Sequence, residues 1–86
     1  MAQHNLGLCY AQGRGVEQDY VQAAFWARRA AEQGVVQAVA LLGTLTFFGD
    51  GVPQDKESGL NMLLQAADLG DEWARRAIEQ IMPNAD

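Results

Sequence analysis

The stretch Gly-Arg-Gly-Val-Glu-Gln-Asp at residues 13–19 recurs 36 residues later as Gly-Asp-Gly-Val-Pro-Gln-Asp at residues 49–55. Further matches at the same offset follow this stretch: Ala30, Ala31 and Gly34 recur as Ala66, Ala67 and Gly70. A fixed period of about 20 to 50 residues is typical of stacked-repeat proteins, which usually present a surface to a partner. The repeat therefore predicts a solenoid built from two similar units.

The apolar pattern within each unit is helical. Apolar residues recur at intervals of three and four, and no alternating strand pattern appears. We expect five helices, over about residues 2–12, 20–33, 36–48, 56–69 and 71–82.

The repeated turn has features that end one helix and begin the next. Gly13 and Gly49 stand where the first helix of each unit would stop, since glycine accepts the left-handed backbone that closes a helix. Asp19 and Asp55 fit the N-cap of the second helix. Val52, the one apolar residue of its turn, is expected to hold the turn against the core.

The expected last helix departs from the pattern. Glu79 stands at the register of Gly7 and Gly43, where a glycine would let paired helices pack closely. A charged residue there predicts a face that meets water, as the terminal unit of a solenoid requires. The N-terminus shows no such cap.

A longer pattern surrounds the turn: Leu-Gly-x-x-Tyr-x-x-Gly-x-Gly-Val-x-Gln-Asp, then Ala-x-x-Trp and Ala-Ala-x-x-Gly. Its members here are Leu6, Gly7, Tyr10, Gly13, Gly15, Val16, Gln18, Asp19, Ala23, Trp26, Ala30, Ala31 and Gly34. The pattern resembles the Sel1-like repeat, which is related to the tetratricopeptide repeat. The resemblance implies an all-α fold, an α/α superhelix in a single domain over residues 1–86. It comprises repeats at about 1–35 and 36–70 and a capping helix at about 71–82.

The second copy matches this pattern less closely than the first. Thr46 replaces the tyrosine, Gly59 the alanine and Met62 the tryptophan. Some relatives carry a cysteine pair in each repeat, whereas Cys9 is the single cysteine here and cannot form an internal disulfide.

The resemblance implies a non-enzymatic adaptor or scaffold of bacterial type that binds a protein or peptide. Family members are associated with signalling, secretion, host interaction and, in some cases, immunity to toxins. In related helical repeats the concave surface is formed by the first helix of each unit. The positions that this register places there are His4, Leu8, Ala11, Gln12, Gln37, Ala40, Thr44, Phe47, Phe48, Trp73, Arg76 and Gln80. The candidate partner-binding residues among them are Leu8, Gln12, Thr44, Phe47, Phe48, Trp73 and Arg76.

Adjacent aromatic residues follow Thr46 and sharpen this prediction. If Thr46 points inward, Phe47 and Phe48 cannot both be buried with it, because successive helical residues are about 100° apart. One ring should then be exposed as a binding anchor. The alternative is that Phe47 takes the core position of the missing tyrosine and Phe48 covers the repeat junction.

No catalytic, metal or cofactor site is predicted. The Gly-x-Gly turns lack the preceding strand and following Lys-Ser/Thr of a phosphate-binding loop. His4 has no partner at ligand spacing, and Cys9 falls at an inward helical register. The pairs Arg28-Arg29 and Arg75-Arg76 could bind an acidic partner, but solvated helix faces are the favoured interpretation.

Charge and hydropathy narrow the classes of partner. The chain has 6 basic and 11 acidic residues and a net charge of −5, which argues against nucleic acid as a ligand. No apolar run is long enough for a membrane span, and no signal peptide is recognisable, so a cytoplasmic location is the default expectation.

Two and a third repeats fall below the three or so usually needed for independent stability. Two alternatives to the adaptor therefore stay open. One is a structural segment of a longer solenoid, or a homodimer formed through the uncapped N-terminal helix. The other is a small regulatory or immunity-type binding protein.

Overall fold

Four α-helices make up most of the chain that the computed structural model describes, which is residues 12–13 and 18–82. They are α2 (Tyr20–Glu32), α3 (Val36–Phe48), α4 (Lys56–Asp68) and α5 (Glu72–Ile81). No strand occurs in these described ranges. The helices confirm the all-α prediction, and their ends agree with the expected ranges to within one residue. Of the first expected helix, only helical Gln12 is described.

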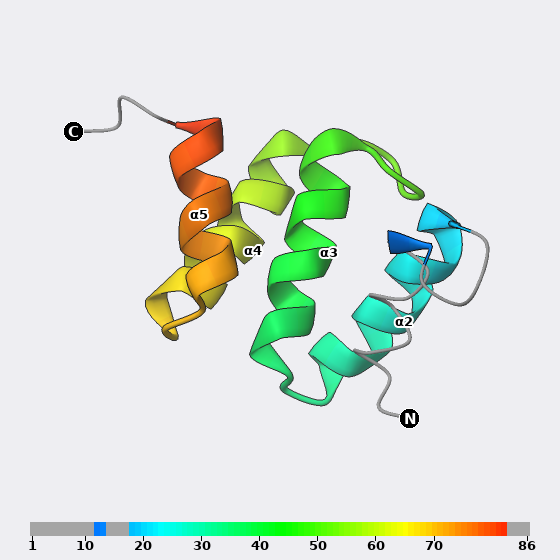
Figure 1. Ribbon diagram of the computed structural model, residues 1–86, viewed down its shortest axis with the longest axis horizontal. Helices are drawn as coiled ribbons and strands as arrows, with labels where there is room; N and C mark the ends of the chain where they lie inside the picture. The colour runs from blue at the N-terminus through cyan, green and yellow to red at the C-terminus, as the bar shows by residue number, and fades with distance from the viewer. Residues whose placement is uncertain (1–11, 14–17, 83–86) are drawn as a thin grey trace.

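The helices stack in sequence, with α3 at the centre (Figure 1). α3 contacts α2, α4 and α5, and α4 also contacts α5, whereas α2 and α4 do not touch. α3 and α5 run in the same direction, and α2 and α4 run opposite to them (Figure 1). This alternation is the predicted helix–turn–helix solenoid. None of these helices is both long and apolar enough to span a membrane.

Aspartates cap three of the helices. Asp19 Oδ1 accepts hydrogen bonds from the backbone N–H groups of Val21 and Gln22 at 3.0 and 3.2 Å. Asp55 Oδ1 accepts one from the N–H of Ser58 at 3.0 Å. These bonds confirm the two predicted N-caps. Asp71 caps α5 in the same way, by accepting from the N–H of Ala74 at 2.8 Å.

The turn between α3 and α4 rests on the start of α2. Gly49 closes α3 in the left-handed conformation with φ 75°, as predicted, and Gly51 also has a positive φ of 76°. A Cβ at Gly51 would overlap the backbone of Tyr20. Val52 packs against the core cluster formed by α2 and α3, which confirms its expected role.

Two glycines let α3 and α4 cross closely. A Cβ on Gly43 would lie 2.9 Å from Met62 Cβ and 3.0 Å from the carbonyl oxygen of Gly59. A Cβ on Gly59 would lie 2.5 Å from the backbone nitrogen of Phe47. Gly43 thus has the predicted packing role, and the glycine that replaces the family's alanine at Gly59 allows this crossing.

The described residues bury two apolar clusters. The first joins α2 to α3 and consists of Ala23, Ala24, Ala27, Leu41, Leu42 and Leu45. The second joins α3 to α4 and α5 and consists of Ala40, Leu63, Ala66 and Ala74. Alanine supplies half of the first cluster and three of the four residues of the second, and such small residues let neighbouring helices approach closely.

Candidate functional site

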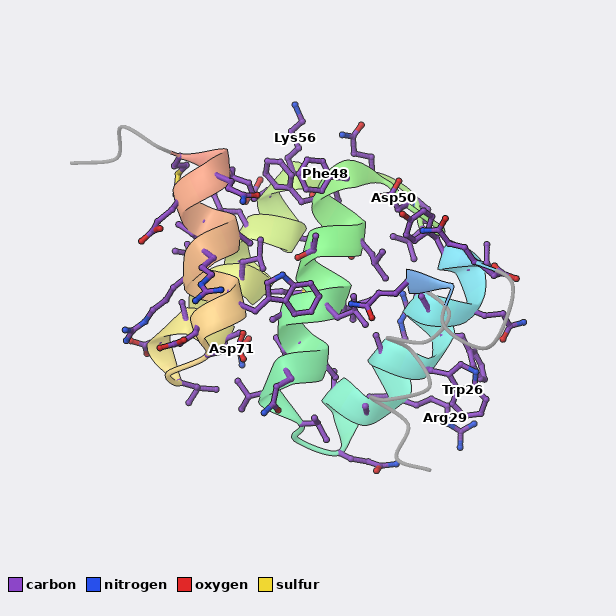
Figure 2. All side chains as sticks on the ribbon, in the orientation of Figure 1. Trp26, Arg29, Phe48, Asp50, Lys56 and Asp71 are labelled. Carbon is purple, nitrogen blue, oxygen red and sulfur yellow. The ribbon has the colours of Figure 1, made fainter. Side chains whose placement is uncertain are left out.

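The predicted aromatic anchor at the end of α3 is exposed. Thr46 is buried, and its hydroxyl donates to the carbonyl oxygen of Leu42 at 2.7 Å. Phe47 is half-buried, and the Phe48 side chain is 54% exposed. The two rings meet edge to face, with centroids 5.1 Å apart. With Thr46 inward, one ring does reach solvent, and Figure 2 shows Phe48 at the C-terminal end of α3.

The residues in the middle of α3 that were expected to line the concave surface are less exposed than predicted. Ala40 was predicted to line the concave surface, and this is wrong: it is fully buried in the second core cluster. The physical reason is that α5 packs directly against α3 beside Ala74, so this position supports the helix contact. Thr44, one turn later, is half-buried, and its hydroxyl donates to the carbonyl oxygen of Ala40 at 3.0 Å.

The α5 candidates face solvent. Trp73 is 39% exposed, and Arg76 and Gln80 are exposed as well. Because α3 and α5 are parallel, the repeat register places Trp73 level with Gln37, near the start of α3. Phe48 lies 11 residues further along, so the two aromatic residues are separated by roughly 16 Å along the helix axes.

We call Thr44, Phe47, Phe48, Trp73 and Arg76 the α3–α5 face. The structure places them on two adjacent helices. The Phe47 and Phe48 rings contact each other, but Trp73 lies apart from this pair. Of the remaining candidates, Gln12 is exposed, and Leu8 lies outside the described residues together with His4, Ala11 and Cys9.

A second exposed surface was missed by the sequence analysis. Val21 and Phe25 on α2 are 62% and 50% exposed. The Phe25 and Trp26 rings meet edge to face at 5.1 Å, and the Arg29 guanidinium lies 5.7 and 5.8 Å from their centroids. Figure 2 shows Trp26 and Arg29 together on the side of α2 away from α3. The sequence did contain a signal for this surface: Val21 and Phe25 are spaced by four residues and precede the pair Arg28-Arg29.

Among the described residues, the pKa that clearly departs from its ordinary value belongs to Asp55, the N-cap of α4. The backbone N–H and hydroxyl of Ser58 donate to the Asp55 carboxylate and lower its pKa below the usual 3.8. The carboxylate is exposed at the start of α4, so this shift reflects capping. In the part of the chain that the structure describes, no group of three His, Cys, Asp or Glu residues is placed to hold a metal ion.

A family model described as Sel1 repeat matches residues 1–35 and again residues 36–71. The chain belongs to the Sel1 repeat family. Proteins built from Sel1 repeats generally mediate protein–protein interactions, and their fold is generally a non-enzymatic scaffold.

Two solved structures have the same fold. One is a protective antigen present in uropathogenic Escherichia coli strains, described as displaying an SLR fold, with 36% identity and a TM-score of 0.80. The other is a Sel1 repeat protein from Oxalobacter formigenes, with 35% identity and a TM-score of 0.79. Each similarity covers 91% of this chain. The matched region spans 17% of the first protein and 59% of the second.

Proposed function

We propose that this Sel1 repeat chain is a non-enzymatic protein-binding module whose partner segment lies along the α3–α5 face. Membership of a family of interaction scaffolds supports the general role. The exposure of Phe48 and Trp73 supports the face, because both are large aromatic side chains that stay partly exposed on neighbouring helices. Exposed aromatic residues of this kind commonly anchor a partner.

The spacing of the two rings favours a polypeptide as the ligand. A separation of roughly 16 Å corresponds to about five residues of extended chain or about three turns of helix. By the repeat register, the polar residues Thr44, Arg76 and Gln80 fall at levels between those of Trp73 and Phe48 along the two helices. Two apolar anchors with polar contacts between them suit a segment that carries two apolar side chains and hydrogen-bonding groups.

Panning a random peptide library on phage against the 86-residue chain would test this proposal. The variant Phe48→Ala/Trp73→Ala should lose binding of the enriched peptides by tenfold or more, since anchor residues typically contribute about 1 to 2 kcal/mol each. Leu64→Ala/Leu69→Ala is the matched control, because it truncates two exposed apolar residues outside this face. Circular dichroism would verify that both variants fold.

Equal affinity of the enriched peptides for the parent chain and a folded Phe48→Ala/Trp73→Ala variant would refute the assignment of the face. Loss of binding in the Leu64→Ala/Leu69→Ala control would refute it equally, since the peptides would then contact another side of the molecule. The general role as a binding module would be rejected if no peptide were enriched.

A structural role is the second candidate, and the coverage of the two relatives favours it, since both extend well beyond the matched region. In that role the chain would pair with a second copy, or with further repeats, through the helix expected at residues 2–12. Static light scattering over a dilution series would show a mass that falls with dilution. A constant monomeric mass would reject pairing.

A further inference from the structure

The exposed side of α2 carries a row of side chains that no helix of the described chain covers. Val21, Phe25, Arg28 and Glu32 follow one another at intervals of four, three and four, which places them on one face of the helix. All four are exposed, and exposed Arg29 lies beside the row. We call these five residues the α2 face. It belongs to a different helix from those of the α3–α5 face.

Two adjoining hollows lie on the α2 face. The smaller, about 200 Å³, is lined by Val21, Ala24, Phe25, Arg28, Gly51 and Val52. The larger, about 470 Å³, is lined by Phe25, Arg28, Arg29, Glu32 and Gln33. Phe25 and Arg28 line both. The smaller hollow is walled mainly by carbon and backed by the α3–α4 turn. Four of the five residues that line the larger hollow are charged or polar, although carbon atoms still form more than half of its wall.

The charge of the larger hollow selects an anion. Arg28 and Arg29 contribute two positive charges and Glu32 one negative charge, in a chain whose net charge is −5. Within the described residues, neither guanidinium forms an ion pair with a carboxylate. Stacking of Arg29 on Phe25 and Trp26 holds that guanidinium against the helix. A guanidinium binds a carboxylate through a planar pair of N–H donors, so a carboxylate side chain fits this hollow.

The spacing of the hollows indicates the conformation of the ligand. The α2 residues that line the two hollows are centred four residues apart, which is roughly 6 Å along the helix. Alternate side chains of an extended peptide point to the same side and repeat at about 6.7 Å. An extended segment therefore places one side chain in each hollow.

We propose that the α2 face is a second docking surface, and that its occupant is an extended acidic peptide segment. An aliphatic side chain fills the smaller hollow, and an Asp or Glu carboxylate two residues away pairs with Arg28 and Arg29 in the larger one. The aliphatic group covers Val21 and Phe25, which removes exposed apolar surface from water. This proposal does not depend on the role of the α3–α5 face.

The test uses blocked peptides that differ at one position. The first probe is Gly-Leu-Ser-Glu-Gly, the second carries Gln in place of Glu, and the third carries Lys. Each is titrated to millimolar concentration into the ¹⁵N-labelled 86-residue chain, and amide chemical shifts are followed. We expect the Glu peptide to shift amides of α2 and of residues 51–52. The Gln and Lys peptides should bind at least about fivefold more weakly than the Glu peptide, and added salt should weaken the binding of the Glu peptide.

Matched variants separate this surface from general charge effects. Arg28→Ala/Arg29→Ala should bind the Glu peptide at least about fivefold more weakly than the parent chain. Lys56→Ala/Arg75→Ala removes the same charge from exposed positions outside the α2 face and should bind it normally. Val21→Ala should weaken binding of the Glu and Gln peptides by the same factor, because Val21 lines the smaller hollow only and its loss removes apolar contact alone. Circular dichroism would check that all three variants fold.

Three results would overturn the proposal. One is equal binding of the Glu and Gln peptides. Another is a set of shifts confined to α3 and α5, which would assign the peptide to the α3–α5 face. The third is the absence of shifts at millimolar peptide. Failure of the phage selection on the α3–α5 face would not affect these measurements, so the two proposals fail separately.

Discussion

At the scale of single residues, two glycines with the same backbone conformation have very different surroundings. Gly34 and Gly51 have φ values of 87° and 76°, in the left-handed region. A Cβ at Gly34 meets nothing within 4 Å, whereas one at Gly51 overlaps the backbone of Tyr20. Gly34→Ala should cost about 1 to 2 kcal/mol of stability from backbone strain alone. Gly51→Ala should cost about 3 to 5 kcal/mol, since the turn must also move away from α2. Urea unfolding would measure both, and equal losses would contradict the argument.

The same pair shows what single residues reveal in the sequence. A positive φ could be predicted at both positions because each glycine stands at a helix end or in a turn, and that requirement is local. The contact of Gly51 with Tyr20 joins residues 31 positions apart, and no local pattern encodes it. The exposure of one of the two rings, Phe47 or Phe48, was predictable once Thr46 was taken to point inward, but not which ring it would be. The burial of Ala40 depended on how closely α5 approaches α3.

At the scale of helices, the cap of α4 gives a pH-dependent prediction. The hydrogen bonds from Ser58 lower the pKa of Asp55 in the folded chain, so the unfolded chain takes up the proton first as the pH falls. The resulting stabilisation is fully present above the ordinary pKa of 3.8 that the unfolded chain has, and it is lost as the pH falls through the folded value. Asp55→Asn keeps a capping oxygen without the charge. The stability difference between parent and variant should therefore shrink from about pH 6 to about pH 3 in urea unfolding.

Ser58→Ala tests the cause of that shift. The variant removes the hydroxyl donor to Asp55 but keeps the backbone N–H donor, so the Asp55 pKa should rise part of the way towards its ordinary value. A carboxyl ¹³C titration by NMR would follow the group directly. An unchanged Asp55 pKa in the folded variant would show that the hydroxyl bond does not contribute.

Helix boundaries were the most predictable elements of this fold, for a physical reason. Asp19 and Asp55 as caps, and Gly49 as a terminator, act on backbone groups within a few residues of themselves. The crossing of α3 and α4 was only half predictable. Gly43 followed from the repeat, while Gly59 looked like a departure from the family pattern. In the structure Gly59 is needed because its Cα faces the backbone of Phe47, where a Cβ would clash.

At the scale of the whole molecule, binding surfaces were harder to predict than the stack of helices. The repeat register selected the first helix of each unit, and so it pointed to α3 and α5. The register gave no reason to expect a surface on the outer side of α2. The pair Arg28-Arg29 was interpreted there as a solvated helix face, without the neighbouring Phe25. The smaller hollow on that side is completed by Gly51 and Val52 of the α3–α4 turn, and the pattern of residues within α2 does not encode that contact.

The division of the core into two clusters predicts how the molecule unfolds. Leu41 is 3% exposed in the cluster between α2 and α3, and Leu63 is fully buried in the cluster that joins α4 and α5 to α3. Leu63→Val and Leu41→Val each remove one buried methylene and should cost about 1 kcal/mol. In a solenoid each unit is stabilised mainly by its neighbours, so the loss should be largest near the change. Native-state hydrogen exchange should show that Leu63→Val lowers the opening free energy of α5 amides at least about twice as much as that of α2 amides. Leu41→Val should reverse this order, and a uniform loss across all helices in both variants would instead establish a single cooperative unit.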